Sequence, residues 1–119
     1  MAQKTVLITG CSRGIGHGLV IEFLKKNFRV IATCRNPEKA TDLVKTLEQH
    51  KQFPAIPLDV ASSESITKCL KAVKEKGVEK IDVLVNNAGV SNRNHPDDAA
   101  TDVDRWVYTS IFFVNGYNV

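Results

Sequence analysis

Short apolar runs rich in β-branched residues alternate along the chain with segments whose apolar side chains recur at helical spacing. The runs predict strands over residues 4–9, 29–33, 55–60 and 81–85. The i, i+3, i+4, i+7 spacing between them predicts helices over residues 14–26, after Asn36-Pro37 and after Ser62. Asn36 and Ser62 are suited to cap the second and third helices, and Gly77 is suited to end the third.

This strand–helix alternation predicts an α/β fold in which helices cover both faces of a parallel sheet, giving three αβα layers. Pro57 lacks a backbone N–H, so the third strand is expected at an edge of the sheet. Right-handed crossovers then give the strand order 3-2-1-4. Ligands of such sheets bind beyond the carboxyl ends of the strands where the order reverses, which here is between strands 1 and 4.

The pattern becomes less regular toward the C-terminus, which divides the chain into a sheet-forming region, residues 1–91, and a tail, residues 92–119. Residues 92–98 are polar and typical of turns. Residues 102–114 favour a helix, although their aromatic and β-branched content also suits a strand. The apolar positions there are Val103, Trp106, Val107, Ile111 and Val114.

Composition narrows the function classes. A length of 119 residues favours one domain, and a net charge of +3 without a basic cluster argues against a nucleic-acid partner. We expect no signal peptide, no membrane span and no metal site, because no stretch has the required pattern. Cys11, Cys34 and Cys69 form no paired motif, which favours reduced thiols and a cytoplasmic location.

The candidate chemistry begins in the turn after the first strand, where Gly10, Gly14 and Gly16 follow Thr9. Glycines let the backbone turn sharply and approach a phosphate without a Cβ in the way. The N–H groups and the positive dipole end of the next helix then face the anion. The turn therefore predicts a binding site for the pyrophosphate of a dinucleotide.

The second strand ends at Cys34 and Arg35, where an NAD-selective site would place Asp or Glu. An Arg fork matches a phosphate instead. We interpret Arg35 and Arg13 as a pair that selects NADP over NAD, with Cys34 lining the adenosine pocket. The alternative is that Arg35 is simply solvated in an exposed loop.

Taken together, these stretches resemble the short-chain dehydrogenase/reductase family, and residues 30–37 look most like its carbonyl-reductase branch, which includes C-factor and sniffer-like members. The resemblance covers roughly residues 4–91. It implies a Rossmann-type fold and an NADP(H)-dependent oxidoreductase that reduces a small carbonyl compound or oxidises a secondary alcohol. The matching motifs are Thr9-Gly10-x-x-x-Gly14-x-Gly16, Arg35, Leu58-Asp59-Val60 and Asn86-Asn87-Ala88-Gly89.

The resemblance also implies a role for each cofactor-binding residue. Arg35 would meet the 2′-phosphate, and Asp59 and Val60 would sit at the adenine. The residues implied around the pyrophosphate and adenosine ribose are Gly10, Ser12, Arg13, Gly14, Ile15 and Gly16. Those implied along the path to the nicotinamide ribose are Asn87, Ala88 and Gly89.

The chain departs from the family in its catalytic residues, which are a Ser, a Tyr-x-x-x-Lys pair and an Asn. Four residues after Tyr108 stands Phe112, and Tyr117 is followed by only two residues, so no Tyr-x-x-x-Lys pair exists here. Asn115 is the nearest match to the catalytic Asn. We therefore predict that this chain is catalytically inactive.

Two interpretations stay open. The chain is either the NADP(H)-binding portion of a longer oxidoreductase, with an incomplete version of the family fold, or a non-catalytic half-domain that binds a nucleotide or a partner. The uncovered side of the fourth strand and the apolar tail predict self-association through an exposed strand edge.

Overall fold

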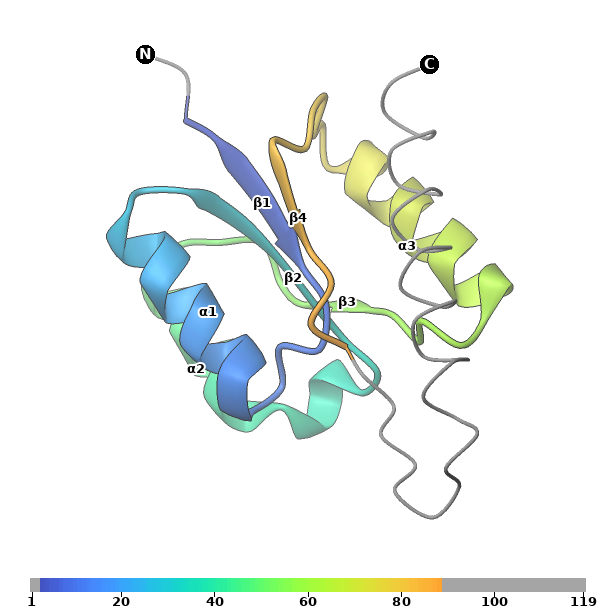
Figure 1. Ribbon diagram of the computed structural model, residues 1–119, viewed down its shortest axis with the longest axis horizontal. Coiled ribbons are helices and arrows are strands. Elements are labelled where there is room, and N and C mark those ends of the chain that lie inside the picture. The colour runs from blue at the N-terminus through green and yellow to red at the C-terminus, as the bar shows by residue number, and fades with distance from the viewer. Residues whose placement is uncertain (1–2, 89–119) are drawn as a thin grey trace.

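A parallel sheet runs through the centre of the structure, a computed structural model that describes residues 3–88. Its strands follow the order β3-β2-β1-β4, which confirms the order expected from the sequence. Figure 1 shows the strands side by side, with helices on either side of them. The strands are β1 (Thr5–Ile8), β2 (Arg29–Cys34), β3 (Ile56–Pro57) and β4 (Val83–Val85).

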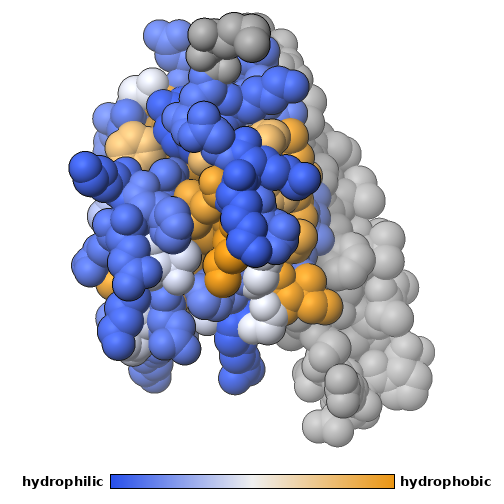
Figure 2. Space-filling model, turned by 90° about the vertical axis from the view of Figure 1, so that its left-hand side faces the viewer, coloured by the Kyte–Doolittle hydropathy of each residue, from blue (hydrophilic) through white to orange (hydrophobic). Residues whose placement is uncertain are grey.

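Helices cover both faces of the sheet. Helices α1 (Gly14–Lys25) and α2 (Thr41–Gln49) lie on one face, and α3 (Ser63–Glu75) lies on the other (Figure 1). Side chains alternate along β1, so Val6 and Ile8 belong to the core under α1 and α2, and Leu7 to the core under α3. Figure 2, which views the molecule from the side of α1 and α2, shows a largely hydrophilic surface with some hydrophobic residues visible among the hydrophilic ones.

The register of the sheet brings the ends of three strands to one edge. Ile8, the last residue of β1, pairs with Ala32 of β2 and with Val85 of β4. Because all the pairings are parallel, the loops that follow β1, β2 and β4 leave the sheet at the same edge. This is the edge at which the sequence places its candidate binding residues.

The third strand is shorter than expected, but its position is confirmed. Only Ile56 and Pro57 pair with β2, and β3 lies at one end of the strand order. Pro57 cannot donate to the ladder, and the next residue, Leu58, still donates its N–H to the carbonyl of Cys34 at 2.9 Å. The chain therefore follows β2 to its end before it turns into α3.

The predicted cap of α3 at Ser62 is confirmed, and the predicted cap at Asn36 is confirmed in position only. The Ser62 hydroxyl accepts a hydrogen bond from the N–H of Ser65, as an N-cap does. Asn36 stands at the N-cap position with Pro37 after it, as predicted, but of a short 3₁₀ turn, η1 (Pro37–Lys39), and its side chain makes no capping bond; α2 begins only at Thr41, after Ala40. Ala40, which separates η1 from α2, is buried in the core under α2.

The tail expected to be helical and the predicted boundary at residue 91 lie outside the described residues, as do Gly89 and Asn115. Within residues 3–88, no helix is long and apolar enough to cross a membrane, and no cluster of His, Cys, Asp and Glu side chains suits a metal ion.

Candidate functional site: a pocket at the carboxyl edge of the sheet

The glycine turn after β1 reverses the chain and starts α1 directly at the edge of the sheet. Gly10 and Gly14 have φ of 68° and 60°, a left-handed conformation that residues with a Cβ rarely adopt. Helix α1 begins with no side-chain cap and no acidic residue in its first turn. Its first N–H groups and the positive end of its dipole are therefore left for an anion.

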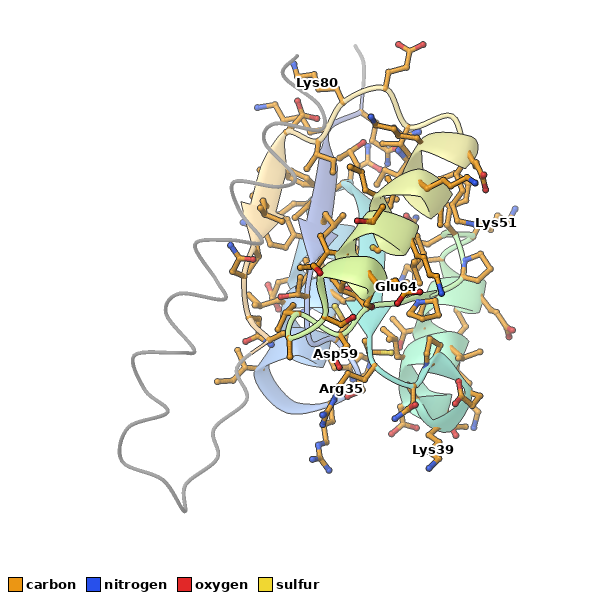
Figure 3. The ribbon with its side chains drawn as sticks, turned by 90° about the vertical axis from the view of Figure 1, so that its right-hand side faces the viewer. Arg35, Lys39, Lys51, Asp59, Glu64 and Lys80 are labelled. Atoms are coloured by element: carbon orange, nitrogen blue, oxygen red, sulfur yellow. The ribbon has the colours of Figure 1, made fainter. Side chains whose placement is uncertain are left out.

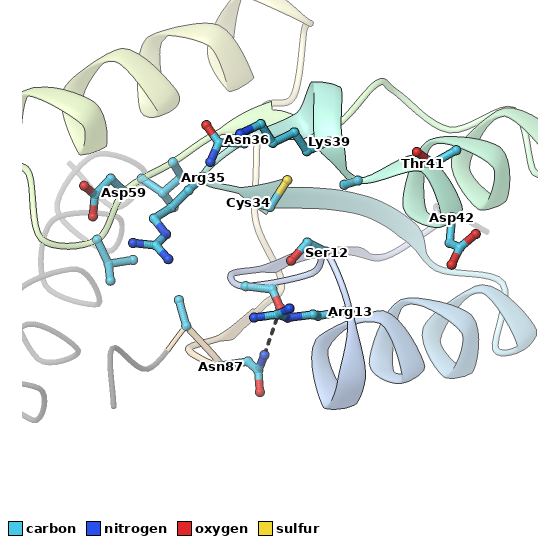
Figure 4. A pocket seen from close by; sticks show the side chains of 15 residues that line it. Ser12, Arg13, Cys34, Arg35, Asn36, Lys39, Thr41, Asp42, Asp59 and Asn87 are labelled. Carbon is cyan, nitrogen blue, oxygen red and sulfur yellow. Dashed lines mark hydrogen bonds between the residues drawn. The ribbon is translucent and has the colours of Figure 1, made fainter. Parts of the chain in front are cut away.

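Hydrogen bonds tie this turn to the loop after β4. The Thr9 hydroxyl accepts from the backbone N–H groups of Asn87, at 3.0 Å, and Ala88, at 2.9 Å. The side-chain amide of Asn87 donates to the carbonyl of Gly10 at 3.1 Å, the dashed line in Figure 4. The two loops are far apart in the sequence, and these bonds hold them as one unit.

Gly16 makes this junction possible. A Cβ built on Gly16 would overlap the carbonyl oxygen of Gly10 and lie 2.7 Å from the amide nitrogen of Asn87. The first turn of α1 therefore packs directly on the glycine turn and on the Asn87 side chain. Gly16 does not line the pocket described next, and the observed role of this residue is to permit this close packing.

A pocket of about 650 Å³ opens at this edge of the sheet. It gathers side chains from the glycine turn, the loop after β2, the start of α2, and the loops after β3 and β4 (Figure 4). Predicted cofactor residues that line it are Gly10, Ser12, Arg13, Arg35, Asp59, Val60, Asn87 and Ala88. Predicted residues that do not line it are Gly14, Ile15 and Gly16.

Ile15 lies beside the pocket rather than in its wall. Its side chain is 77% exposed in the first turn of α1, although it is large and apolar. Ile15, which the sequence analysis placed near the cofactor, is therefore not one of the residues that line the pocket.

Positive side chains surround the pocket opening. Arg13 and Arg35 lie on opposite sides of it in Figure 4, and Lys39 projects from η1. All three are exposed, and none forms a salt bridge with another residue of the range 3–88. Figure 3 places Arg35, Lys39 and Asp59 at the same end of the molecule, opposite Lys80. These cations are available to an anionic ligand.

Asp59 is held in place by its neighbours. Its carboxylate Oδ1 accepts from the N–H of Ala61 at 2.9 Å, and its own N–H donates to the Ser65 hydroxyl at 2.8 Å. Asp59 is half-buried at the pocket wall, and Leu58 and Val60 on either side of it are buried apolar residues. Such a wall suits a flat apolar group with a polar edge.

Sequence reasoning missed the second wall of the pocket, which η1 and the start of α2 build. The lining residues that it did not assign are Asn36, Lys39, Ala40, Thr41, Asp42 and Leu58. One feature of the sequence could have indicated this second wall. Asn36-Pro37 follows the carboxyl end of β2 directly, so the turn it begins had to lie at this edge.

The cysteines are buried and free, and one of them lines the pocket. Burial raises the pKa of Cys11 and of Cys69 to about 12, and burial is also the main cause that raises the pKa of Cys34. The Cys11 thiol donates to the carbonyl of Ile8 at 3.1 Å. Thiols with raised pKa values are poor nucleophiles at neutral pH, so Cys34 contributes shape to the pocket rather than reactivity.

Replacing Gly16 with alanine is expected to destabilise the chain by about 2–4 kcal/mol, because the new methyl group would push the glycine turn away from Asn87. Gly18 is the matched control, since it lies in the same helix with open space around it. Gly18→Ala is expected to stabilise by about 0.5–1 kcal/mol. Urea unfolding followed by circular dichroism measures both. Equal midpoints for the two variants would contradict the packing described here.

Comparison with known proteins shows which family this chain resembles. A family model described as short chain dehydrogenase matches residues 4–115. A short-chain dehydrogenase/reductase of Pestalotiopsis microspora is 44% identical over 91 residues, which is 76% of this chain and 30% of that protein. The NADPH-dependent pterin aldehyde reductase of Arabidopsis thaliana is 36% identical over 114 residues, which is 93% of this chain and 46% of that protein.

Solved structures of carbonyl reductases have a similar fold. NADPH-bound carbonyl reductase from chicken fatty liver superposes with a TM-score of 0.78 at 28% identity, covering 98% of this chain and 48% of that one. Sniffer of Caenorhabditis elegans superposes with a TM-score of 0.72 at 32% identity, covering 98% and 53%. The chain spans less than half the length of the curated relatives named above. On this evidence the chain belongs to the short-chain dehydrogenase/reductase family of oxidoreductases.

Proposed function

We propose that this chain binds NADP(H), with the adenosine 2′-phosphate end of the nucleotide in the pocket at the carboxyl edge of the sheet. The observation that carries the proposal is the set of cations, Arg13, Arg35 and Lys39, that surround the pocket without a salt-bridge partner among residues 3–88. A 2′-phosphate supplies the negative charge that such a set would bind.

The position after β2 supports NADP(H) over NAD(H). An acidic residue there would accept hydrogen bonds from the ribose hydroxyls and repel a phosphate. Arg35 stands at that position instead and lines the pocket. Because Arg13 approaches from the opposite wall, a phosphate between the two would be contacted from both sides (Figure 4).

The proposed roles of the other cofactor-binding residues follow from where each residue lies relative to the pocket. Asp59 and Val60 would hold the adenine, with the carboxylate accepting from its amino group. The pyrophosphate would lie against the glycine turn and the uncapped start of α1, the residues proposed there being Gly10, Ser12, Arg13, Gly14, Ile15 and Gly16. Asn87, Ala88 and Gly89 would continue toward the nicotinamide ribose, of which Asn87 and Ala88 line the pocket.

The chemistry proposed for longer relatives is the reduction of a small carbonyl compound or the oxidation of a secondary alcohol. NADP(H) when bound supplies or accepts the hydride. The proton requires a separate acid or base, which the family provides from Tyr-x-x-x-Lys, and this sequence has no such pair. We propose that this chain keeps the cofactor-binding portion of the site without that proton donor. Asn115, the nearest match to the catalytic Asn of the family, would not replace the missing pair.

A second candidate function is the binding of a partner or of another copy at β4. Within the described residues β4 pairs only with β1, and Val83–Val85 are half-buried. A strand with one unpaired edge is a template for further pairing. This is the observation that favours a partner-binding half-domain.

The nucleotide preference depends on Arg35. The unmodified chain is expected to bind NADPH at least tenfold more tightly than NADH, and Arg35→Glu is expected to remove most of that difference, since a charge-assisted contact contributes about 1.5–3 kcal/mol. Titrations followed by nucleotide fluorescence measure both constants. Lys71→Glu, an exposed charge reversal on α3, is the control and should keep the preference. Equal affinity of the unmodified chain for the two nucleotides would refute the proposal.

Mixing the chain with NADPH and a reactive dicarbonyl compound is expected to give no loss of nicotinamide absorbance above background, because the sequence lacks Tyr-x-x-x-Lys. The full-length Arabidopsis thaliana reductase named above, assayed with a pterin aldehyde, controls for the condition of the NADPH. Consumption of NADPH in proportion to the concentration of this chain would show that another group here handles the proton.

A further inference from the structure

One side-chain hydrogen bond links α1, which follows the glycine turn, to α2, whose first residues line the pocket. His17 Nε2, on α1, lies 3.0 Å from the hydroxyl oxygen of Thr46, on α2, and both side chains are half-buried. The Thr46 hydroxyl also donates to the carbonyl of Asp42 at 3.0 Å. A hydroxyl has a single hydrogen, so when Thr46 donates to Asp42 it accepts from His17, and Nε2 then carries the proton.

These two hydrogen bonds connect α1, through α2, to a residue that lines the pocket. Helix α1 begins at Gly14, next to Arg13, and His17 lies in its first turn. Helix α2 begins at Thr41, two residues after Lys39, and Asp42, whose carbonyl accepts the second of these bonds, lines the pocket itself. The His17–Thr46 bond therefore joins the helix that follows Arg13 to the helix that follows Arg35 and Lys39.

We propose that the His17–Thr46 hydrogen bond is a positioning contact that sets the distance between the two walls, and through it the preference for a 2′-phosphorylated nucleotide. The inference rests on the proposed NADP(H) binding. A phosphate contacted from both walls needs both sets of donors at hydrogen-bond distance, and such contacts weaken steeply as the distance grows. NADH has no 2′-phosphate and is less sensitive to the same displacement.

The test compares the ratio of the NADH and NADPH dissociation constants in the full chain and its variants. His17→Phe removes the donor and keeps a ring, and Thr46→Val removes the acceptor and keeps the shape. Each is expected to lower the ratio about three- to tenfold, which is the effect of losing one hydrogen bond. Thr46→Ser keeps the hydroxyl and is expected to keep the ratio. The double variant His17→Phe/Thr46→Val should lower it no further than either single change.

The outcomes separate this inference from the proposal on which it rests. If the unmodified chain prefers NADPH and the folded variants keep the same ratio, the positioning role is overturned and NADP(H) binding stands. If the unmodified chain shows no preference for NADPH, both fail. A further measurement needs no variant and no nucleotide: ¹⁵N resonances of the His17 ring should show a proton on Nε2. A neutral ring protonated only on Nδ1 would overturn the inference.

Discussion

The structure depends on the hydrogen bonds that join the end of β1 to the end of β4. The Thr9 hydroxyl accepts from the N–H groups of Asn87 and Ala88, and the Asn87 side chain donates to Gly10. Parallel strands bring their carboxyl ends to one edge but do not fix the loops beyond it. These bonds do so, and Gly16 lets α1 begin against them. These bonds fix the glycine turn relative to the loop after β4.

The remaining walls of the pocket add charge to this base. Arg13 comes with the glycine turn, and Arg35 and Lys39 come with the connection from β2 to α2, so the cations reach the opening from two separate elements. Asp59 contributes a carboxylate that the backbone of Ala61 already contacts. The pocket thus combines a positive opening with a partly apolar wall, the combination that a phosphorylated adenosine requires.

The strand order could be predicted from the sequence because local residues determine it: Pro57 restricts β3 to an edge, and the regular alternation of strands and helices implies right-handed crossovers. The second wall could not be predicted in the same way. The chain after Pro37 forms a separate turn before α2, and Ala40 between the two packs against core residues distant in the sequence, which local patterns do not specify. The bonds of Asn87 to Gly10 and of His17 to Thr46 connect residues distant in sequence, and periodicity contains no information about them.

Amide resonances of the ¹⁵N-labelled chain, recorded while NADPH is added, test the central claim most directly. The account predicts that the shifts concentrate at the carboxyl edge of the sheet, at Gly10, Arg35 and Val60. A second pocket, lined by Lys4 and Lys80 among others, lies at the opposite edge and should remain unaffected. Shifts centred on that second pocket, or no shifts at any concentration of NADPH, would contradict the account.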